Sequence, residues 1–249
     1  MGNATKVMLV TGASRGIGAE VAMLASKRGF AVGVNYGRDE KAARDVVGRV
    51  EHGGGRAIAL QADVADQAQV ERMFASLDAS LGTIDALVNN AGLLDVVAID
   101  DVSEERLLKS YRANVFGMAY CAREAVRRMS TARGGRGGTI VNLSSAASRL
   151  GVLGAAYAGT KGATDAFTLA LANEVAAQGI RVTAVRPGLI DTTIHAASGG
   201  VDNMRERAKT AVPMRRPGSA AEVAEAIVWL ASEQASYVHG TILDVSGGR

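Results

Sequence analysis

The stretch Lys6-Val-Met-Leu-Val-Thr-Gly-Ala-Ser-Arg-Gly-Ile-Gly18 joins a short apolar run to a cluster of closely spaced glycines. The apolar run over 6–11 is typical of a buried strand, and the apolar residues from Ala19 to Ala25 recur at helical spacing. Glycines at a turn between strand and helix let the backbone approach a pyrophosphate, whose charge then rests on the helix N-terminus. The sequence therefore predicts that an α/β fold begins here with a dinucleotide-binding turn.

Strands and helices alternate along the rest of the chain. Apolar runs predict further strands over 31–36, 57–61, 84–88, 139–145, 181–186 and 241–245. Helical spacing predicts helices over 41–55, 66–82, 103–129 and 157–179, and a capping box at Ser219 and Glu222 begins another. We therefore expect one domain over 1–249, an α/β Rossmann-type, doubly wound parallel sheet of seven strands with helices on both faces. The pattern weakens over 195–216, where we expect a substrate lid.

Acidic and basic residues are interspersed rather than segregated. The chain has 28 Lys and Arg against 25 Asp and Glu, a net charge of +3, which indicates a mixed solvated surface and no nucleic-acid partner. The run Arg133-Gly-Gly-Arg-Gly-Gly138 is similar to an RNA-binding arginine–glycine segment. Because it occurs once, between a predicted helix and a predicted strand, we interpret it as a flexible surface loop.

The sequence indicates no membrane, metal or oxidising compartment. Cys121 is the only cysteine and lies among small apolar residues, which is typical of a core position. The histidines lack the spacing of metal ligands, so no metal is expected. There is no apolar run of about 18 residues and no N-terminal stretch of secretory type. We therefore expect a soluble, cytoplasmic protein without a metal ion.

A second informative stretch runs from Ser144 to Lys161. Tyr157 and Lys161 are four residues apart, so on a helix they share one face, although this spacing alone is more typical of an ordinary surface helix. A fixed ammonium, helped by a cationic nicotinamide ring, could lower the pKa of the phenol by about 3, equivalent to about 4 kcal/mol. The strand before them ends in the hydroxyls of Ser144 and Ser145, where open α/β sheets place functional groups.

Four motifs occur together in order: the glycine turn of 11–18, Asn89-Asn90-Ala-Gly92, the Tyr157–Lys161 pair, and Pro187-Gly188. With them, the chain from Lys6 to Gly248 resembles the short-chain dehydrogenase/reductase family, and most resembles its 3-oxoacyl carrier-protein reductases and glucose-dehydrogenase-like members. The resemblance implies hydride transfer between a nicotinamide dinucleotide and a carbonyl or secondary alcohol. It also implies a homotetramer. It does not predict the substrate or the preferred direction of the reaction.

The resemblance implies roles for four catalytic residues. Asn114 would distort its helix and hold a water that links the lysine to solvent, while Tyr157 would transfer the proton and Lys161 would lower its pKa. A serine hydroxyl would orient the substrate carbonyl. In relatives it commonly lies 13 residues before the tyrosine, as Ser144 does here, but position relative to the strand favours Ser145, 12 residues before. Both hydroxyls remain open, with Ser145 preferred.

The predicted cofactor site includes the end of the second strand, where NAD-selective enzymes usually carry a carboxylate. Here Arg38 stands close to that end, and Arg15 lies in the glycine turn, so NADP(H) is favoured and NAD(H) remains possible. Asp63 and Val64 would bind adenine by resemblance, although they also fit a helix-entry turn. The predicted cofactor-binding residues are Gly12, Ser14, Arg15, Gly16, Ile17, Gly18, Asn35, Tyr36, Arg38, Asp63, Val64, Asn89, Ala91, Gly92, Tyr157, Lys161, Pro187, Gly188, Ile190 and Thr192.

A different class of function is a dinucleotide-binding sensor or interaction protein that keeps the fold without catalysis. Such proteins typically lose a catalytic group. This chain keeps the asparagine, serine, tyrosine and lysine together, which favours an enzyme.

Overall fold

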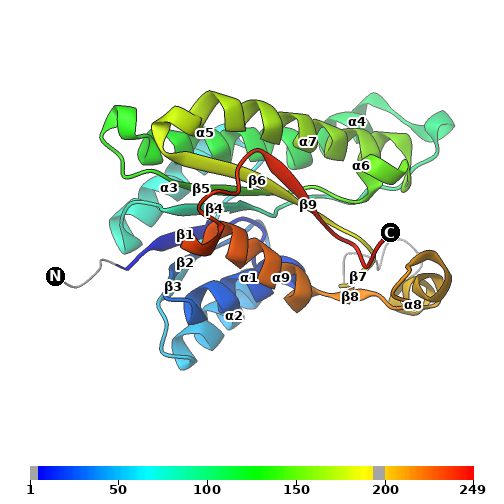
Figure 1. The fold of residues 1–249 in the computed structure, drawn as a ribbon, viewed down its shortest axis with the longest axis horizontal. Helices are drawn as coiled ribbons and strands as arrows, with labels where there is room; N and C mark the ends of the chain where they lie inside the picture. The colour runs from blue at the N-terminus through cyan, green and yellow to red at the C-terminus, as the bar shows by residue number, and fades with distance from the viewer. Residues whose placement is uncertain (1–4, 193–199) are drawn as a thin grey trace.

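The computed structural model describes residues 5–192 and 200–249, and there a seven-stranded parallel sheet has the order β3-β2-β1-β4-β5-β6-β9 (Figure 1). The predicted doubly wound α/β fold is confirmed. The strands are β1 Val7–Val10, β2 Ala31–Tyr36, β3 Ala57–Gln61, β4 Ala86–Asn89, β5 Gly138–Leu143, β6 Ile180–Pro187 and β9 Thr241–Val245.

Helices cover both faces of the sheet. Figure 1 shows α5 and α7 on one side and α1, α2 and α9 on the other. Side chains alternate between the two layers, since Met8 and Val10 join the core under α1, α2 and α9, while Val7 and Leu9 join the core under α3, α5 and α7. The central strands are mostly apolar because both of their faces are buried. The main helices are α1 Gly16–Lys27, α2 Glu40–His52, α3 Gln67–Leu81, α4 Glu104–Tyr111, α5 Gly117–Met129, α6 Ala147–Leu150, α7 Ala155–Val175 and α9 Ala220–Ala231.

The strand order reverses between β1 and β4. From β1 the chain adds β2 and β3 on one side, and from β4 it adds β5, β6 and β9 on the other. In open α/β sheets a crevice forms beyond the carboxyl ends of the strands at such a reversal. The glycine turn follows β1 and the 89–92 motif follows β4, so the fold brings these two motifs to one place.

The predicted helix over 103–129 is interrupted. A π-helical turn at Arg112–Phe116 separates α4 from α5 and contains Asn114. Periodicity did not reveal this turn, although the resemblance implied a distortion at Asn114. In the part of the chain that the structure describes, no helix is long and apolar enough to cross a membrane.

The predicted lid over 195–216 is described only from residue 200, so the positions up to 199, His195 among them, lie outside the described residues. A helix, α8 Gly200–Ala211, occupies most of the remainder. Met204, Ala208 and Val212 pack with Leu189 in a small apolar cluster of their own. The strands β7 Ile190–Asp191 and β8 Gly218–Ser219 pair beside it.

The loop over 133–138 lies mostly at the surface, as predicted, but Gly135 and Gly137 are packed against neighbouring backbone. A Cβ on Gly135 would lie 2.4 Å from the carbonyl oxygens of Arg128 and Met129. Gly137 has φ +79, and a Cβ there would lie 2.5 Å from the carbonyl oxygen of Gly179. Gly135 and Gly137 therefore allow the backbone to pack closely at this loop. Cys121 is fully buried, as predicted, and burial raises its pKa to about 12.

We expect Gly135→Ala to lower the free energy of unfolding by about 1–3 kcal/mol, because its methyl group must displace two backbone carbonyls. Gly48→Ala is the matched control. Gly48 lies inside α2 with open space around its Cβ position, so alanine there should raise the free energy of unfolding by about 0.5–1 kcal/mol. Urea unfolding midpoints at one protein concentration measure both. Equal effects of the two substitutions would show that the loop is not tightly packed.

Candidate active site

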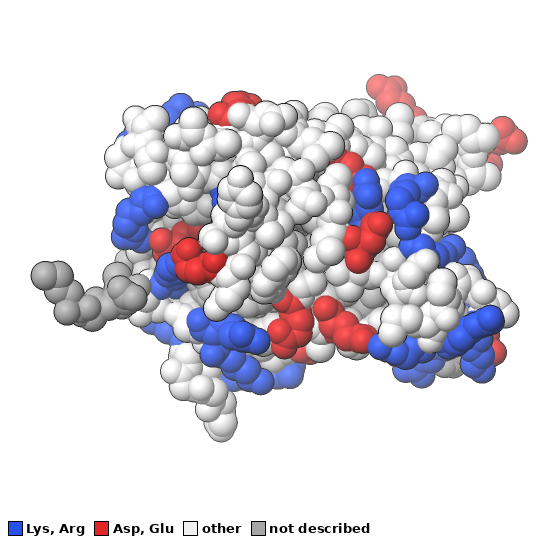
Figure 2. Space-filling model, viewed as in Figure 1, with Lys and Arg blue, Asp and Glu red and all other residues white. Residues whose placement is uncertain are grey.

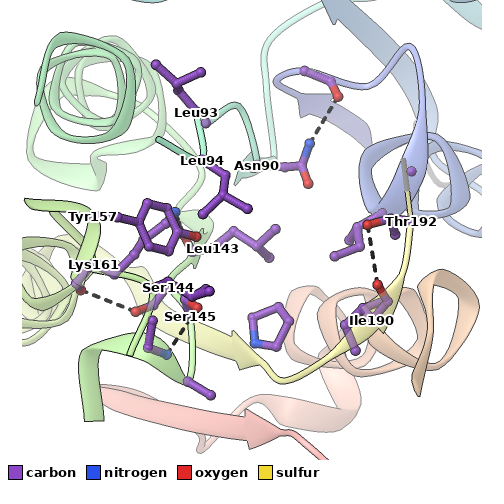
Figure 3. A pocket seen from close by; sticks show the side chains of 18 of the residues that line it. Asn90, Leu93, Leu94, Leu143, Ser144, Ser145, Tyr157, Lys161, Ile190 and Thr192 are labelled. Atoms are coloured by element: carbon purple, nitrogen blue, oxygen red, sulfur yellow. Dashed lines mark hydrogen bonds between the residues drawn. The ribbon is translucent and has the colours of Figure 1, made fainter. Parts of the chain in front are cut away.

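A cavity of about 550 Å³ lies along the carboxyl ends of the central strands. The loops after β1, β2, β4, β5 and β6 contribute to its wall, together with residues from α7 and α8. Figure 3 shows the side chains of Tyr157, Ser145 and Leu143 on one side of this space and Ile190 and Thr192 on the other. The cavity therefore joins the glycine turn to the Tyr157–Lys161 pair.

The glycine turn forms one end of the cavity. Gly12 has φ +61, and a Cβ there would lie 2.9 Å from the Cα of Ala91, so only glycine allows the loops after β1 and β4 to meet. Gly16 and Ile17 begin α1 and line the cavity, and the first turn of that helix carries no acidic residue. A helix N-terminus without a carboxylate, approached closely by backbone, suits the phosphates of a dinucleotide.

Asn35 supports this turn from behind. Its side chain is 1% exposed, accepts a hydrogen bond from Gly12 N at 3.0 Å, and donates to the carbonyls of Leu60 and Ala62 at 3.1 and 3.2 Å. Tyr36 is also buried, and neither residue is among those that line the cavity. At this strand end the lining residues are Gly37, Arg38 and Asp39. The side chain of Asn35 therefore holds the turn in position from behind the cavity wall.

Four other predicted cofactor residues lie outside the lining: Gly18, Asp63, Val64 and Asn89. Asp63 Oδ1 accepts a hydrogen bond from Ala65 N at 3.0 Å, which is the turn arrangement weighed as the alternative. Asn89 Nδ2 donates to Asn142 Oδ1 at 2.9 Å in the interior. Its neighbour Asn90, which carried no prediction, lines the cavity. The other predicted cofactor residues all contribute to the wall.

Tyr157 and Lys161 lie one turn apart on α7 and both are buried at the cavity wall. Lys161 Nζ is 5.9 Å from the centre of the Tyr157 ring and donates to the carbonyl of Leu143 at 2.8 Å. The two serines differ. Ser144 Oγ is buried and donates to the carbonyl of Lys161 at 3.2 Å, whereas the half-buried Ser145 accepts from Ala147 N and interacts with Tyr157.

Asn114 sits behind this group without lining the cavity. It is 3% exposed; its Oδ1 accepts from Leu93 N at 2.6 Å, and its Nδ2 donates to Leu93 O at 2.9 Å and to Thr160 Oγ1 at 3.0 Å. A Cβ on Gly92 would lie 3.1 Å from Asn114 Oδ1 and 3.7 Å from Lys161 Nζ. Gly92 therefore lies close to both Asn114 and Lys161, with no side chain of its own to separate them.

Burial dominates the electrostatics of the site. Burial raises the pKa of Tyr157, and the hydrogen bond with Ser145 only partly opposes it. Burial lowers the pKa of Lys161 from 10.5 to about 8, against the opposing effect of Asp165. The chain alone does not meet the expectation that Lys161 lowers the pKa of Tyr157, because the causes of the shift are burial and Ser145, and Lys161, 5.9 Å from the ring centre, is not among them. The phenol is held in its protonated form.

The sequence analysis did not predict several of the residues that line the cavity. Leu93 and Leu94 directly follow the 89–92 motif, so extending that motif by two residues would have found them. The others carry no pattern that marks them. They are Leu143, Ala146, Ala147, Leu150, Val152, Leu153, Leu189, Arg207 and Arg249.

Comparisons with known proteins agree with this geometry. Residues 12–249 match the family model described as enoyl-(acyl carrier protein) reductase. The chain is 48% identical to the uncharacterized oxidoreductase YgfF of Escherichia coli K12, over 98% of this chain and 99% of that protein. It is 35% identical to the 3-oxoacyl-[acyl-carrier-protein] reductase FabG of Staphylococcus aureus, over 98% of both chains. The crystal structure of acetoin dehydrogenase from Enterobacter cloacae is similar, with a TM-score of 0.89 and 33% identity, covering 99% of this chain and 96% of that one.

We expect Lys161→Met to raise the free energy of unfolding by about 2 kcal/mol at pH 7. Lowering a lysine pKa from 10.5 to about 8 corresponds to a cost of about 3 kcal/mol for burying the ammonium, of which the lost hydrogen bond to Leu143 offsets about 1 kcal/mol. As the pH rises from about 8 to 10.5, the folded protein releases this proton before the unfolded chain does, so the cost disappears.

The measurement is urea unfolding of both proteins at pH 7 and pH 10. Lys109→Met, which removes an exposed lysine from α4, is the control and should show no such change with pH. A stability difference between Lys161→Met and the unaltered chain that stays constant across this range would contradict burial of the charge.

Proposed function

Because this chain belongs to the short-chain dehydrogenase/reductase family, we propose that it transfers a hydride between NADP(H) and a carbonyl or secondary alcohol with Tyr157 as the proton donor and acceptor. Family membership makes it an oxidoreductase that uses a nicotinamide dinucleotide and acts on a small molecule. The observation that carries the finer proposal is that Ser145, Tyr157 and Lys161 line the same cavity as the glycine turn.

The protonation state of Tyr157 suits reduction of a carbonyl. Its raised pKa keeps the phenol protonated at neutral pH, so it can donate a proton to the oxygen of a substrate. Ser145, which interacts with the same hydroxyl, can orient that oxygen. When bound, the dinucleotide supplies the hydride, or accepts it in the reverse direction.

Lys161 can return the proton to Tyr157. A lysine with a pKa of about 8 exchanges protons at neutral pH far more readily than an ordinary lysine. Asn114 and Lys161 both lie close to Gly92, so a proton path from Lys161 past Asn114 would complete the set of four groups. In this scheme Ser144 is a supporting residue, because its hydroxyl is bonded to the backbone of α7.

The charges at the end of β2 favour the phosphorylated cofactor. Arg15 and Arg38 are exposed and line the same end of the cavity. Asp39 is the one carboxylate among the lining residues that the structure describes, and its side chain accepts a hydrogen bond from Ala42 N at 3.0 Å as the cap of α2. Two guanidinium groups and an engaged carboxylate suit a ribose 2′-phosphate better than free ribose hydroxyls.

Three further expectations are part of the proposal. They are a cytoplasmic location, a substrate lid over 195–216, and a homotetramer. Exposed large apolar side chains support the oligomer, because isolated chains rarely expose clusters of such residues. On and near α4 and α7 these are Leu107, Leu108, Phe116 and Leu169.

Tyr157→Phe should lower kcat by about 10²–10⁴-fold because it removes the proton donor, while NADPH affinity changes little. Ser145→Ala should lower kcat by a smaller factor, and Ser144→Ala by less than Ser145→Ala. Tyr237→Phe, at a fully exposed tyrosine, is the control.

The measurements are NADPH consumption with a panel of ketones, 3-oxoacyl thioesters, quinones and sugars, and NADPH titration by calorimetry. Full activity of Tyr157→Phe would refute the assignment, and NADPH binding without turnover by the unaltered protein would favour a sensor.

Arg38→Gln should reduce the ratio of kcat/KM for NADPH over NADH by about 10–100-fold, since it removes a charge-assisted hydrogen bond to the 2′-phosphate. Kinetics with NADH should change little. Arg44→Gln is the control, because Arg44 is an exposed arginine on α2 that pairs with Glu40. If Arg38→Gln lowered kcat/KM for NADPH and for NADH by the same factor, the Arg38 guanidinium would not bind the 2′-phosphate.

A further inference from the structure

Two arginines reach the cavity from segments that lie beyond the family motifs. Arg207 belongs to α8, and Arg249 follows β9. Figure 1 shows the C-terminal end of the chain beside the strand pair β7–β8 and close to α8. This neighbourhood is held by backbone, since Met214 N donates to Gly247 O at 3.2 Å.

Basic residues gather over α8 in Figure 2, and most of those nearby are paired. Arg205 pairs with Asp191, Lys209 with Glu206, and Arg216 with Glu222. By contrast, the described side chains provide no carboxylate partner for the guanidinium of Arg207 or of Arg249. The backbone carbonyl of Arg249 is held by Arg149 and Ser246, which leaves its side chain for the cavity.

The two guanidinium groups influence each other. Burial lowers the pKa of Arg249, and the positive charge of Arg207 lowers it further. Folding therefore places two like charges, the exposed Arg207 and the half-buried Arg249, on one wall of the cavity. An anion in this space would relieve their mutual repulsion, and two guanidinium forks can bind it with several charge-assisted hydrogen bonds.

The position of the pair separates it from the predicted 2′-phosphate site. Arg38 follows β2 and Arg249 follows β9, and these strands are five steps apart in the sheet. At a strand spacing of about 4.8 Å, their ends are about 24 Å apart. Apolar lining residues lie beside the pair: Leu189 packs with α8, which carries Arg207, and Leu150 and Val152 closely follow Arg149, which donates to the main-chain oxygen of Arg249. The pair therefore lies beside an apolar part of the wall, at the other end of the cavity from the predicted 2′-phosphate site.

We propose that the substrate is a carbonyl compound with an anionic oxygen group, a carboxylate or a phosphate, which Arg207 and Arg249 bind while Tyr157 faces the carbonyl. This rests on the proposed function. The apolar wall accommodates the carbon chain that connects the two groups. Arg207 and Arg249 are thus specificity-determining residues that act on binding and position, not on proton transfer.

The kinetic test compares straight-chain oxo acids, with the carbonyl successively farther from the carboxylate, against their methyl esters and against the matching oxoalkyl phosphates. The preferred anion should be reduced more efficiently than its ester. Arg207→Gln and Arg249→Gln should each lower kcat/KM for that anion about 10–100-fold, mainly through KM, and change the ester less than about threefold. Lys209→Gln, which also removes one positive charge from α8, should leave kcat/KM for both the anion and the ester unchanged. Arg207→Lys should lower kcat/KM for the anion less than Arg207→Gln does.

Equal losses for acid and ester would show a structural effect, and a loss of NADPH affinity would place the pair at the cofactor; either result overturns the proposal. The preference between carboxylate and phosphate identifies the anion. Where no carbonyl consumes NADPH, the proposed function fails, and a second measurement decides the anion site separately.

That measurement is thermal unfolding of the full chain with NADPH and with hexanoate, hexyl phosphate or neutral hexanamide. One of the two anions should raise the Tm of the unaltered protein and of Lys209→Gln, and should have no effect on the double variant Arg207→Gln/Arg249→Gln. Neutral hexanamide should not raise the Tm of any of the three proteins. Equal stabilisation of the double variant, or none of the unaltered protein, would overturn the anion site whether or not turnover is seen.

Discussion

The active-site geometry depends on a clamp between the ends of β1 and β4. Parallel strands hold each other by backbone hydrogen bonds only along their length, so the loops beyond them need other bonds. Thr11 supplies them: its N donates to Val88 O at 3.0 Å, and its Oγ1 accepts from Asn90 N and Ala91 N at 3.0 Å. Asn90 Nδ2 donates in return to the carbonyls of Thr11 and Gly12. These bonds fix both walls of the crevice before any ligand arrives, which is the preorganisation that binding of a long dinucleotide requires.

A second constraint is that the site contains ionisable groups in a desolvated place. Burial pushes Tyr157 towards the neutral phenol and Lys161 towards the neutral amine, so the chain alone weakens the charged forms of both. Lys161 is thereby moved towards proton exchange at neutral pH, while Tyr157 is held as the protonated phenol, at a cost in stability that a purely structural helix would avoid. Such costs are expected where function, rather than folding, selects the residue.

The sequence predicted the architecture well because each signal was local. The strands over 31–36, 57–61 and 241–245 have the predicted bounds, since each apolar-rich run has turn-forming residues at or near its ends, such as Gly37, Gly55 and Gly240. Motif residues at strand ends were placed less well. Asn89 and Asn90 are neighbours, and only the observed register shows that Asn89 faces the interior while Asn90 lines the cavity. The π-helical turn at Asn114 and the position of Arg207 and Arg249 in the cavity wall depend on tertiary packing. The periodicity of the sequence does not encode such packing.

The two ends of the cavity are anchored differently. Tyr157, Ser145 and the glycine turn are all carried by the central sheet or by helices packed on it, so their relative positions are stiff. Arg207 is carried by α8, whose buried face contacts a separate small cluster with Leu189, Met204, Ala208 and Val212. Regions with few buried apolar contacts open and change more easily than the core. If Tyr157 is the proton donor, as proposed, substitutions around this cluster would alter which molecule is held against it without moving it, so a change of substrate would not require a change of reaction.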